Sequence, residues 1–199
     1  MVLMSPPIPT IVFLRHGETD WNVEGRLQGQ RDIPLNANGR AQARRNGETI
    51  AQKIPEAAGF DFVASPLWRA RETMEIARGA MGLDPKAYAV DPRLVEITFG
   101  ELEGFTYQDI EDRQPGWLKE RDANKWEFLP PGGESYRMLH DRIVAWVETV
   151  KRPMVVVAHG GVGRVLRAHL LGLDKAASVA EDFPQDRVFL WRDGQGMWV

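Results

Sequence analysis

Short apolar runs alternate with amphipathic segments along this 199-residue chain, and this alternation limits the fold more than any other feature. Each apolar run has the length of a buried strand, and the segments between the runs have helical spacing. The expected strands lie at residues 10–14, 60–64, 87–90 and 154–158, and the expected helices at about residues 41–52, 67–81, 106–113, 135–151 and 162–171. Because such alternation is typical of a sheet covered on both faces, we predict an α/β fold: a three-layer α/β/α sandwich with a mostly parallel central sheet.

The rest of the chain is expected to be less regular. Residues 1–9, with three prolines, are an irregular lead-in, and residues 20–29 are a polar loop. Residues 114–133 are rich in proline, glycine, tryptophan and charge and show no clean period, so about residues 105–133 are expected to form a lid or insert. The last strands, 187–191 and 197–199, are expected to pair as a hairpin. Length and a 43% hydrophobic content fit a single domain over residues 1–199.

Composition excludes several classes of function. A net charge of −3 offers neither a basic footprint for nucleic acid nor a polybasic membrane anchor. The chain has no cysteine, which excludes disulfides, thiolate zinc sites and cysteine nucleophiles. No secretory signal and no run long enough to span a bilayer is present, so a cytoplasmic protein without nucleic-acid or membrane partners is expected.

The first strand ends abruptly in Arg15, His16 and Gly17. Arginine offers a planar fork of donors that matches phosphate oxygens, and histidine can attack phosphorus to form a covalent intermediate. Glycine lets the backbone turn sharply next to a ligand. A strand followed by a solvated polar turn would explain these three residues equally well, so the stretch alone does not decide between the two interpretations.

Two further strands end in turns suited to phosphate. Ser65 and Pro66 follow the second strand and are expected to cap a helix whose first turn carries Arg69. His159 and Gly160 follow the strand at residues 154–158. Since the carboxyl ends of parallel strands lie along one edge of a sheet, these turns are expected to meet the first one there.

A carboxylate in an apolar setting can serve as a general acid. Glu96, Glu101 and Glu103 all lie in one short stretch, and the residues themselves do not choose among them. His140 and His169 fall inside expected helices and are interpreted as structural or surface residues. The glycines that follow His159 do not complete a dinucleotide-binding fingerprint.

Taken together, the motifs resemble those of the histidine phosphatase superfamily, the phosphoglycerate mutase-like proteins. The matching stretches occur in the family's order and span nearly the whole chain: LRHGET at 14–19, WN at 21–22, RLQG at 26–29, SPL at 65–67, RA at 69–70, Thr73, Glu96, FG at 99–100, EG at 103–104, GES at 133–135 and VAHGG at 157–161.

The resemblance implies an α/β/α sandwich in which His16 is the nucleophile and Glu96 the proton donor. Arg15, Arg69 and His159 would form the phosphate pocket. The residues implied to bind phosphate or substrate are Arg15, Asn22, Gln28, Gly29, Arg69, His159 and Gly160. Neither a metal nor a cofactor is expected, and family habits leave open whether the chain forms a homodimer.

The expected activity is metal-independent hydrolysis of small phosphate monoesters through a phosphohistidine on His16. To attack, His16 must be neutral, with one ring nitrogen donating to a backbone carbonyl. The ligand would be a small-molecule phosphate ester or inorganic phosphate.

The main alternative is a cofactor-dependent phosphoglycerate mutase, but residues 105–131 mix acidic and basic side chains and lack the arginine-rich insert of mutases. Trp117, Trp126 and Phe128 fit either a site for an apolar or ring-bearing substrate or packing of the lid, and packing is the preferred interpretation. A catalytically inactive binding module and a metal-dependent hydrolase are the remaining alternatives.

Overall fold

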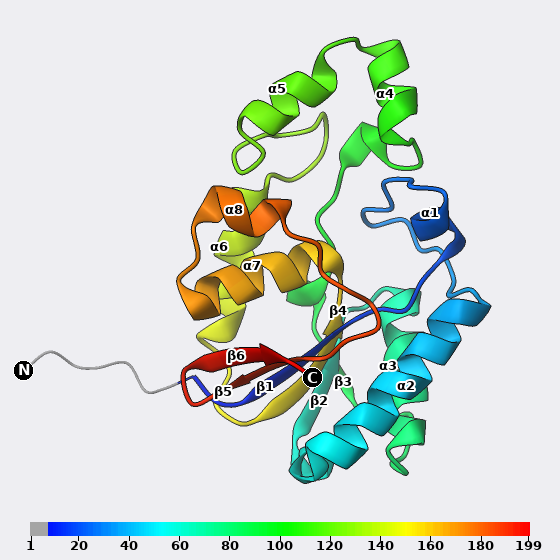
Figure 1. The fold of residues 1–199 in the computed structure, drawn as a ribbon, viewed down its shortest axis with the longest axis vertical. Helices are drawn as coiled ribbons and strands as arrows, with labels where there is room; N and C mark the ends of the chain where they lie inside the picture. The colour runs from blue at the N-terminus through cyan, green and yellow to red at the C-terminus, as the bar shows by residue number, and fades with distance from the viewer. Residues whose placement is uncertain (1–7) are drawn as a thin grey trace, which may run out of the picture.

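The computed structural model describes residues 8–199, and its centre is a six-stranded sheet in the order β3-β2-β4-β1-β5-β6 (Figure 1). The strands are β1 (Ile11–Arg15), β2 (Asp61–Ala64), β3 (Ala89–Val90), β4 (Met154–Ala158), β5 (Phe189–Arg192) and β6 (Gln195–Trp198). The first four are mutually parallel, whereas β5 pairs antiparallel with β1, and β6 pairs antiparallel with β5. Most of the predicted lead-in lies outside the described residues.

Helices cover both faces of the sheet (Figure 1). One face carries α2 (Ala37–Lys53) and α3 (Trp68–Ala80). The other carries α6 (Tyr136–Val147), α7 (Gly160–Leu171) and the short α8 (Lys175–Ala180). The predicted three-layer sandwich with a mostly parallel sheet is therefore confirmed, as is the terminal hairpin, whose turn places both Asp193 and Gly194 at positive φ.

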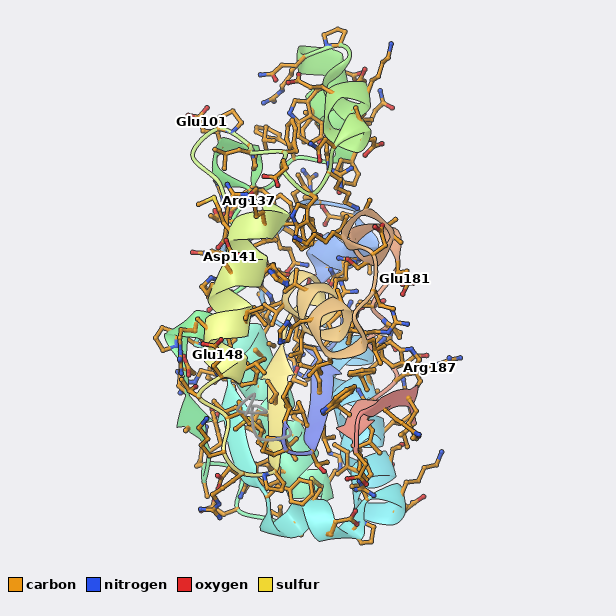
Figure 2. All side chains as sticks on the ribbon, turned by 90° about the vertical axis from the view of Figure 1, so that its left-hand side faces the viewer. Glu101, Arg137, Asp141, Glu148, Glu181 and Arg187 are labelled. Carbon is orange, nitrogen blue, oxygen red and sulfur yellow. The ribbon has the colours of Figure 1, made fainter. Side chains whose placement is uncertain are left out.

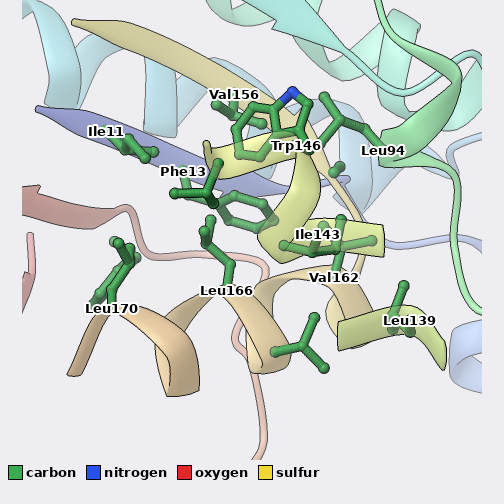
Figure 3. Close-up of a cluster of buried hydrophobic side chains, with 14 of the residues drawn as sticks. Ile11, Phe13, Leu94, Leu139, Ile143, Trp146, Val156, Val162, Leu166 and Leu170 are labelled. Carbon is green, nitrogen blue, oxygen red and sulfur yellow. The ribbon is translucent and has the colours of Figure 1, made fainter. Parts of the chain in front are cut away.

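The two cores follow from the pleat of the strands, in which successive side chains point to opposite faces. On β1, Ile11 and Phe13 pack toward α6 and α7, whereas Val12 and Leu14 pack toward α2 and α3. Figure 3 shows the first of these cores, in which Phe13 lies among side chains of the covering helices. All four of these side chains are completely buried. A strand buried on both faces holds its carboxyl end in a fixed position, and this end carries Arg15.

Residues 99–133 rise above the sheet as a lid (Figure 2). The lid contains α4 (Tyr107–Arg113) and α5 (Trp117–Ala123), and it has a small core of its own formed by Leu27, Leu102, Ile110 and Trp117. Trp117 packs edge-on against Phe128, with ring centroids 5.2 Å apart. Trp126 is also buried, but in the main core. These contacts agree with the packing interpretation of the lid aromatics.

Sequence periodicity missed the shortest elements. The expected loop at 20–29 contains α1 (Asp20–Val23), the expected lid loop contains α5, and α8 was not foreseen. The part of the chain that the structure describes also contains three 3₁₀ helices, η1 (Pro55–Gly59), η2 (Pro92–Leu94) and η3 (Gly100–Leu102). Helices of one or two turns are too short to display a period; α1, for example, is held by a capping box between Thr19 and Asn22. None of the helices in residues 8–199 combines the length and apolar character needed to cross a membrane.

Candidate active site

Three strand ends meet at the lid side of the sheet. The amide of His16 donates to Ala158 O at 2.9 Å, and the amide of Ser65 donates to Val157 O at 3.0 Å. These bonds continue the strand ladders one residue past β1 and β2 and bring the three turns together. The rings of His16 and His159 are consequently 5.2 Å apart between centroids, although 143 residues separate them along the chain.

The ring of His16 is held in one neutral tautomer. Its Nδ1 lies 2.8 Å from Gly17 O, and because a carbonyl only accepts hydrogen bonds, Nδ1 carries the proton and Nε2 keeps a free lone pair. Burial lowers the pKa of His16 well below its ordinary value, and the charges of Arg69 and Arg15 lower it further. The ring is therefore uncharged at neutral pH, as attack on phosphorus requires.

His159 is held by Ser65, with Nε2 and Oγ 2.7 Å apart. Burial and then the charge of Arg69 lower the pKa of His159 well below its ordinary value, so this ring is neutral as well. Its Nδ1 is buried and has no partner among the described residues. When the Ser65 hydroxyl donates to Nε2, the single ring proton resides on Nδ1, which then becomes an unpaired donor suited to an anion.

The structure corrects the expected role of Ser65. Helix α3 begins at Trp68, with Leu67 rather than Ser65 as its capping residue. The carboxylate of Asp32, from the loop that precedes α2, accepts from the amide of Trp68 at 2.7 Å and caps the helix instead. Ser65 is thereby free to bond His159. The local sequence predicted that Ser65 caps the helix because Ser-Pro is common at helix starts. The cap is instead Asp32, which lies 36 residues before Trp68 in the sequence.

Two buried guanidinium groups complete the inner pocket. Arg69 is fully buried, and its Nη1 and Nη2 donate to Arg31 O and Gly29 O at 2.6 and 2.7 Å. Arg15 donates from Nη1 to Phe183 O at 2.7 Å. Each group is therefore anchored at its outer nitrogens, while the buried Nε of each has no partner among residues 8–199. Unpaired buried donors are costly unless a ligand occupies them.

Glu96 is the glutamate of the three that lines this cavity. Its Oε1 accepts from the amide of Ile97 at 2.9 Å and its Oε2 from the amide of Gly161 at 3.1 Å. Glu101 is exposed on the outside of its loop (Figure 2). Glu103 instead joins two loops by accepting from Thr98 Oγ1 and from two backbone amides. The geometry thus distinguishes residues that the sequence left equivalent.

The remaining predicted residues line the same cavity of about 170 Å³, namely Asn22, Gln28, Gly29 and Gly160. Gln28 donates to Thr19 Oγ1 at 2.7 Å, and Asn22 accepts from Gln185 Nε2 at 3.0 Å. Gln185 also donates to His16 O at 3.1 Å. No sequence signal marked Gln185, which reaches the site from the segment before β5. The roles assigned to the predicted residues remain predictions. All of them except His159 line the one cavity, and the fully buried ring of His159 lies 5.2 Å from that of His16.

The cavity is strongly cationic. Six basic side chains and one carboxylate line it; the basic ones are Arg15, Arg26, Arg69, Arg121, Lys125 and Arg164, and the carboxylate is Glu96. Arg121, Lys125 and Arg164 were not foreseen as site residues. His140 and His169 pack edge to face between α6 and α7, with centroids 5.9 Å apart, and do not line the cavity. Within residues 8–199, no three potential metal-ligating side chains gather at one point.

The comparison with known proteins agrees with this geometry. A sequence model of the histidine phosphatase superfamily (branch 1) matches residues 11–186. The chain belongs to this superfamily. A glucosyl-3-phosphoglycerate phosphatase of Mycolicibacterium vanbaalenii is 36% identical over 176 residues, which is 82% of this chain and 74% of that protein. A probable phosphoglycerate mutase, GpmB, of Salmonella paratyphi C is 34% identical over 82% of this chain and 75% of its own length.

Solved structures place this histidine phosphatase in the same group. A mycobacterial glucosyl-3-phosphoglycerate phosphatase in complex with VO₃ superimposes with a TM-score of 0.77 at 31% identity, covering 96% of both chains. A Thermus thermophilus protein, TTHB049, superimposes with a TM-score of 0.71 at 35% identity, covering 91% of this chain and 92% of that one. The family resemblance drawn from the motifs is therefore confirmed.

Proposed function

We propose that this histidine phosphatase hydrolyses small phosphate monoesters by way of a phosphohistidine on His16. The observation that carries the proposal is one cavity lined by a neutral imidazole, two anchored guanidiniums and one carboxylate, with a second neutral imidazole, that of His159, 5.2 Å from the ring of His16. A protein that only bound phosphate would need the cationic groups but would have no use for the carboxylate. The groups match both halves of a double displacement.

In the first step, Nε2 of His16 attacks phosphorus and the bond to the ester oxygen breaks. Charge on the transferring group is stabilised by Arg15, Arg69 and the Nδ1–H of His159. Glu96, in its protonated form, gives its proton to the departing alkoxide. In the second step, the resulting carboxylate takes a proton from water, the water oxygen bonds to phosphorus, and the bond from phosphorus to Nε2 breaks. Inorganic phosphate and free His16 are left, so the cycle closes.

Hydrolysis is favoured over isomerisation by the short lid segment, which lacks an arginine-rich insert, and by similarity to phosphatases over nearly the whole chain. The names of the relatives supply two compounds to test first. Glucosyl-3-phosphoglycerate is the candidate substrate for hydrolysis, and 3-phosphoglycerate is the candidate for the mutase alternative. The relative named as a phosphatase and the relative named as a mutase each match 82% of this chain.

A screen of phosphate release over a metabolite panel tests the proposal. The panel includes both compounds, and 3-phosphoglycerate is assayed with and without 2,3-bisphosphoglycerate to detect isomerisation. The variants are His16→Ala and, as a control outside the cavity, His140→Ala. We expect the wild type and His140→Ala to release phosphate, to do so equally in excess chelator, and to trap acid-labile phosphate from a ³²P-labelled substrate. His16→Ala is expected neither to release phosphate nor to trap it.

Isomerisation that depends on 2,3-bisphosphoglycerate would support the mutase instead, and loss of activity in chelator would support a metal-dependent hydrolase. Phosphate binding without any trapped intermediate would indicate an inactive binding module.

A single domain over residues 1–199, a cytoplasmic location and a homodimer remain predictions. One sheet with helices on both faces supports the first of them.

A further inference from the structure

The carboxylate of Glu103 does not line the active-site cavity, but it joins two loops that do. Its Oε1 accepts three hydrogen bonds: from the amide of Gln30 at 3.0 Å, from Thr98 Oγ1 at 2.9 Å and from the amide of Phe99 at 3.1 Å. Its Oε2 takes part in none of the three. One oxygen of a half-buried carboxylate is therefore the shared acceptor of two segments that are distant in the sequence.

The first of these loops holds Arg69 in the phosphate pocket. Gly29 O and Arg31 O accept from the two outer nitrogens of Arg69 at 2.7 and 2.6 Å. Gln30 lies between these two acceptors, and its amide is the group that donates to Glu103. Gly29 has a φ of +52°, and a Cβ there would overlap Glu103 Oε1, so glycine lets the loop lie directly against the carboxylate. Movement of this loop would carry both acceptors of Arg69 with it.

The second loop carries Glu96. Thr98 and Phe99, which both donate to Glu103, follow Glu96 by two and three residues. The side chain of Gln30 adds a direct connection, because its Nε2 donates to Glu96 O at 3.0 Å. The backbone that orients the expected proton donor is thus tied to the loop that anchors the phosphate-binding arginine.

The two loops also pair through backbone groups that do not involve the Glu103 side chain. The amide of Leu27 donates to Phe105 O at 3.0 Å, and the amide of Gly104 donates to Leu27 O at 2.8 Å. Loss of the Glu103 carboxylate should therefore shift the ends of the loops near the cavity without separating the loops or unfolding the protein.

We propose that Glu103 is a positioning residue for the reaction: it holds the proton donor, Glu96, in register with the phosphate-binding Arg69. Glu103 acts as a hydrogen-bond acceptor and transfers no proton. The inference rests on the proposed phosphatase activity and adds to it a residue outside the cavity. Its importance follows from geometry, because a displacement of about 1 Å in a catalytic group can cost about 100-fold in rate.

Two substitutions at Glu103 separate an acceptor from an acid. Alanine removes the acceptor, whereas the carbonyl oxygen of glutamine can accept the same three bonds but exchanges no proton at neutral pH. Burial lowers the pKa of Arg69, and the charges of Glu96 and Asp32 oppose this effect more strongly than that of Glu103. Arg69 is therefore expected to stay charged in both variants.

The measurements are kcat/KM for two esters and the inhibition constant of inorganic phosphate. The esters are p-nitrophenyl phosphate, whose leaving group needs no proton, and the alkyl phosphate of the metabolite panel that the wild type hydrolyses fastest. We expect Glu103→Ala to lose about 100-fold on the alkyl phosphate. Its activity on p-nitrophenyl phosphate and its inhibition by phosphate should weaken only about 2- to 12-fold, as for one lost hydrogen bond at the phosphate pocket. Glu103→Gln should change each value less than about twofold.

Neighbouring residues supply the controls. Glu101→Ala removes an exposed carboxylate from the same loop (Figure 2) and is expected to change neither ester nor the melting temperature. Thr98→Val removes one donor to Glu103 while keeping the shape of the side chain, and Thr98→Ser keeps the donor. We expect Thr98→Val to lose about 2- to 12-fold on the alkyl phosphate and Thr98→Ser to match the wild type. This pair decides the question if Glu103→Ala does not fold.

Several results would overturn the positioning role. Glu103→Gln as inactive as Glu103→Ala would do so, because the reaction would then need the charge or a proton of this carboxylate. A lower melting temperature in Glu103→Ala with unchanged kinetics would restrict Glu103 to stability, and equal losses on the two esters would show that Glu96 does not depend on it. If the wild type hydrolyses neither ester, the phosphatase proposal fails and the positioning role fails with it.

Discussion

Replacing Gly161 with alanine tests the acid assignment of Glu96 without touching the glutamate. Gly161 lies in the first turn of α7, and its amide donates to Glu96 Oε2 at 3.1 Å. A Cβ at this position would lie 2.6 Å from Glu96 Oε1 and 3.2 Å from Ile97 Cγ2. Ordinary contacts begin near 3.4 Å, so the carboxylate must withdraw by about 0.8 Å.

The expected cost falls on catalysis rather than on folding. Alanine is favoured over glycine inside a helix by about 1 kcal/mol, which opposes the strain of the new contact. A displacement of about 1 Å in a catalytic group can cost about 100-fold in rate. We therefore expect Gly161→Ala to keep its melting temperature within a few degrees of the wild type while kcat/KM for an alkyl phosphate falls about 100-fold.

The choice of leaving group separates a misplaced acid from a damaged pocket. p-Nitrophenolate departs without protonation, and kcat/KM reports only steps up to the first phosphoryl transfer. The loss in kcat/KM on p-nitrophenyl phosphate is therefore expected to stay below about tenfold, less than the roughly 10²- to 10⁴-fold that a typical general acid contributes. The matched control is Gly79→Ala, in the last turn of α3, where the new Cβ would meet Pro85 Cγ at an ordinary contact distance of 3.7 Å. This variant should leave kcat/KM unchanged for both esters.

Equal losses on the two esters would refute the reasoning, because they would show that Gly161 supports the phosphate pocket and not the acid. Full activity on both esters would refute it too, since Glu96 would then not need its present position. In that case another group would have to protonate the leaving oxygen.

Two further predictions concern the buried side chains of His16, His159 and Ser65. Because His16 and His159 have pKa values far below that of an unfolded histidine, the unfolded chain binds more protons than the folded one below about pH 6.5. The free energy of unfolding should therefore fall as pH drops from about 7.5 to 5.5, by up to about 1.4 kcal/mol per pH unit for each ring. Urea titrations should show a smaller dependence of this free energy on pH in His159→Gln than in the wild type. Ser65→Ala should leave the His159 tautomer unfixed and weaken inhibition by inorganic phosphate about 2- to 12-fold, the range of one hydrogen bond; unchanged inhibition would contradict this role.

Much of the fold was predictable because it follows from short-range patterns. The β1 and β4 runs were identified by their apolar content, and α6 and α7 by their helical spacing. The predicted limits of β4 coincide with the observed ones, Met154–Ala158. What failed were elements of one or two turns, such as α1 and α8, whose stability comes from caps and from packing against distant residues rather than from a period.

The candidate site was predictable where a residue's position on its own strand or helix was sufficient. Arg15, His16, Arg69 and His159 each follow a strand end or open a helix, and the sheet brings such ends together. Arg121 and Lys125, which also line the cavity, were missed; Arg121 lies on α5 and Lys125 in the turn that follows it. Their charges looked balanced because the sequence does not show which acids cap the lid helices.

The sequence by itself determined which chemical groups stand at the ends of the buried strands, since strand alternation and glycine turns are properties of neighbouring residues. Only the tertiary structure decided how those groups are used. Of the three glutamates, Glu96 is the one held at the cavity, by a hydrogen bond from the amide of Gly161, 65 residues away. Ser65 bonds His159, 94 residues away, and does not cap its own helix. Hydrogen bonds across such distances depend on how the sheet and the lid are assembled, and no local pattern records that assembly.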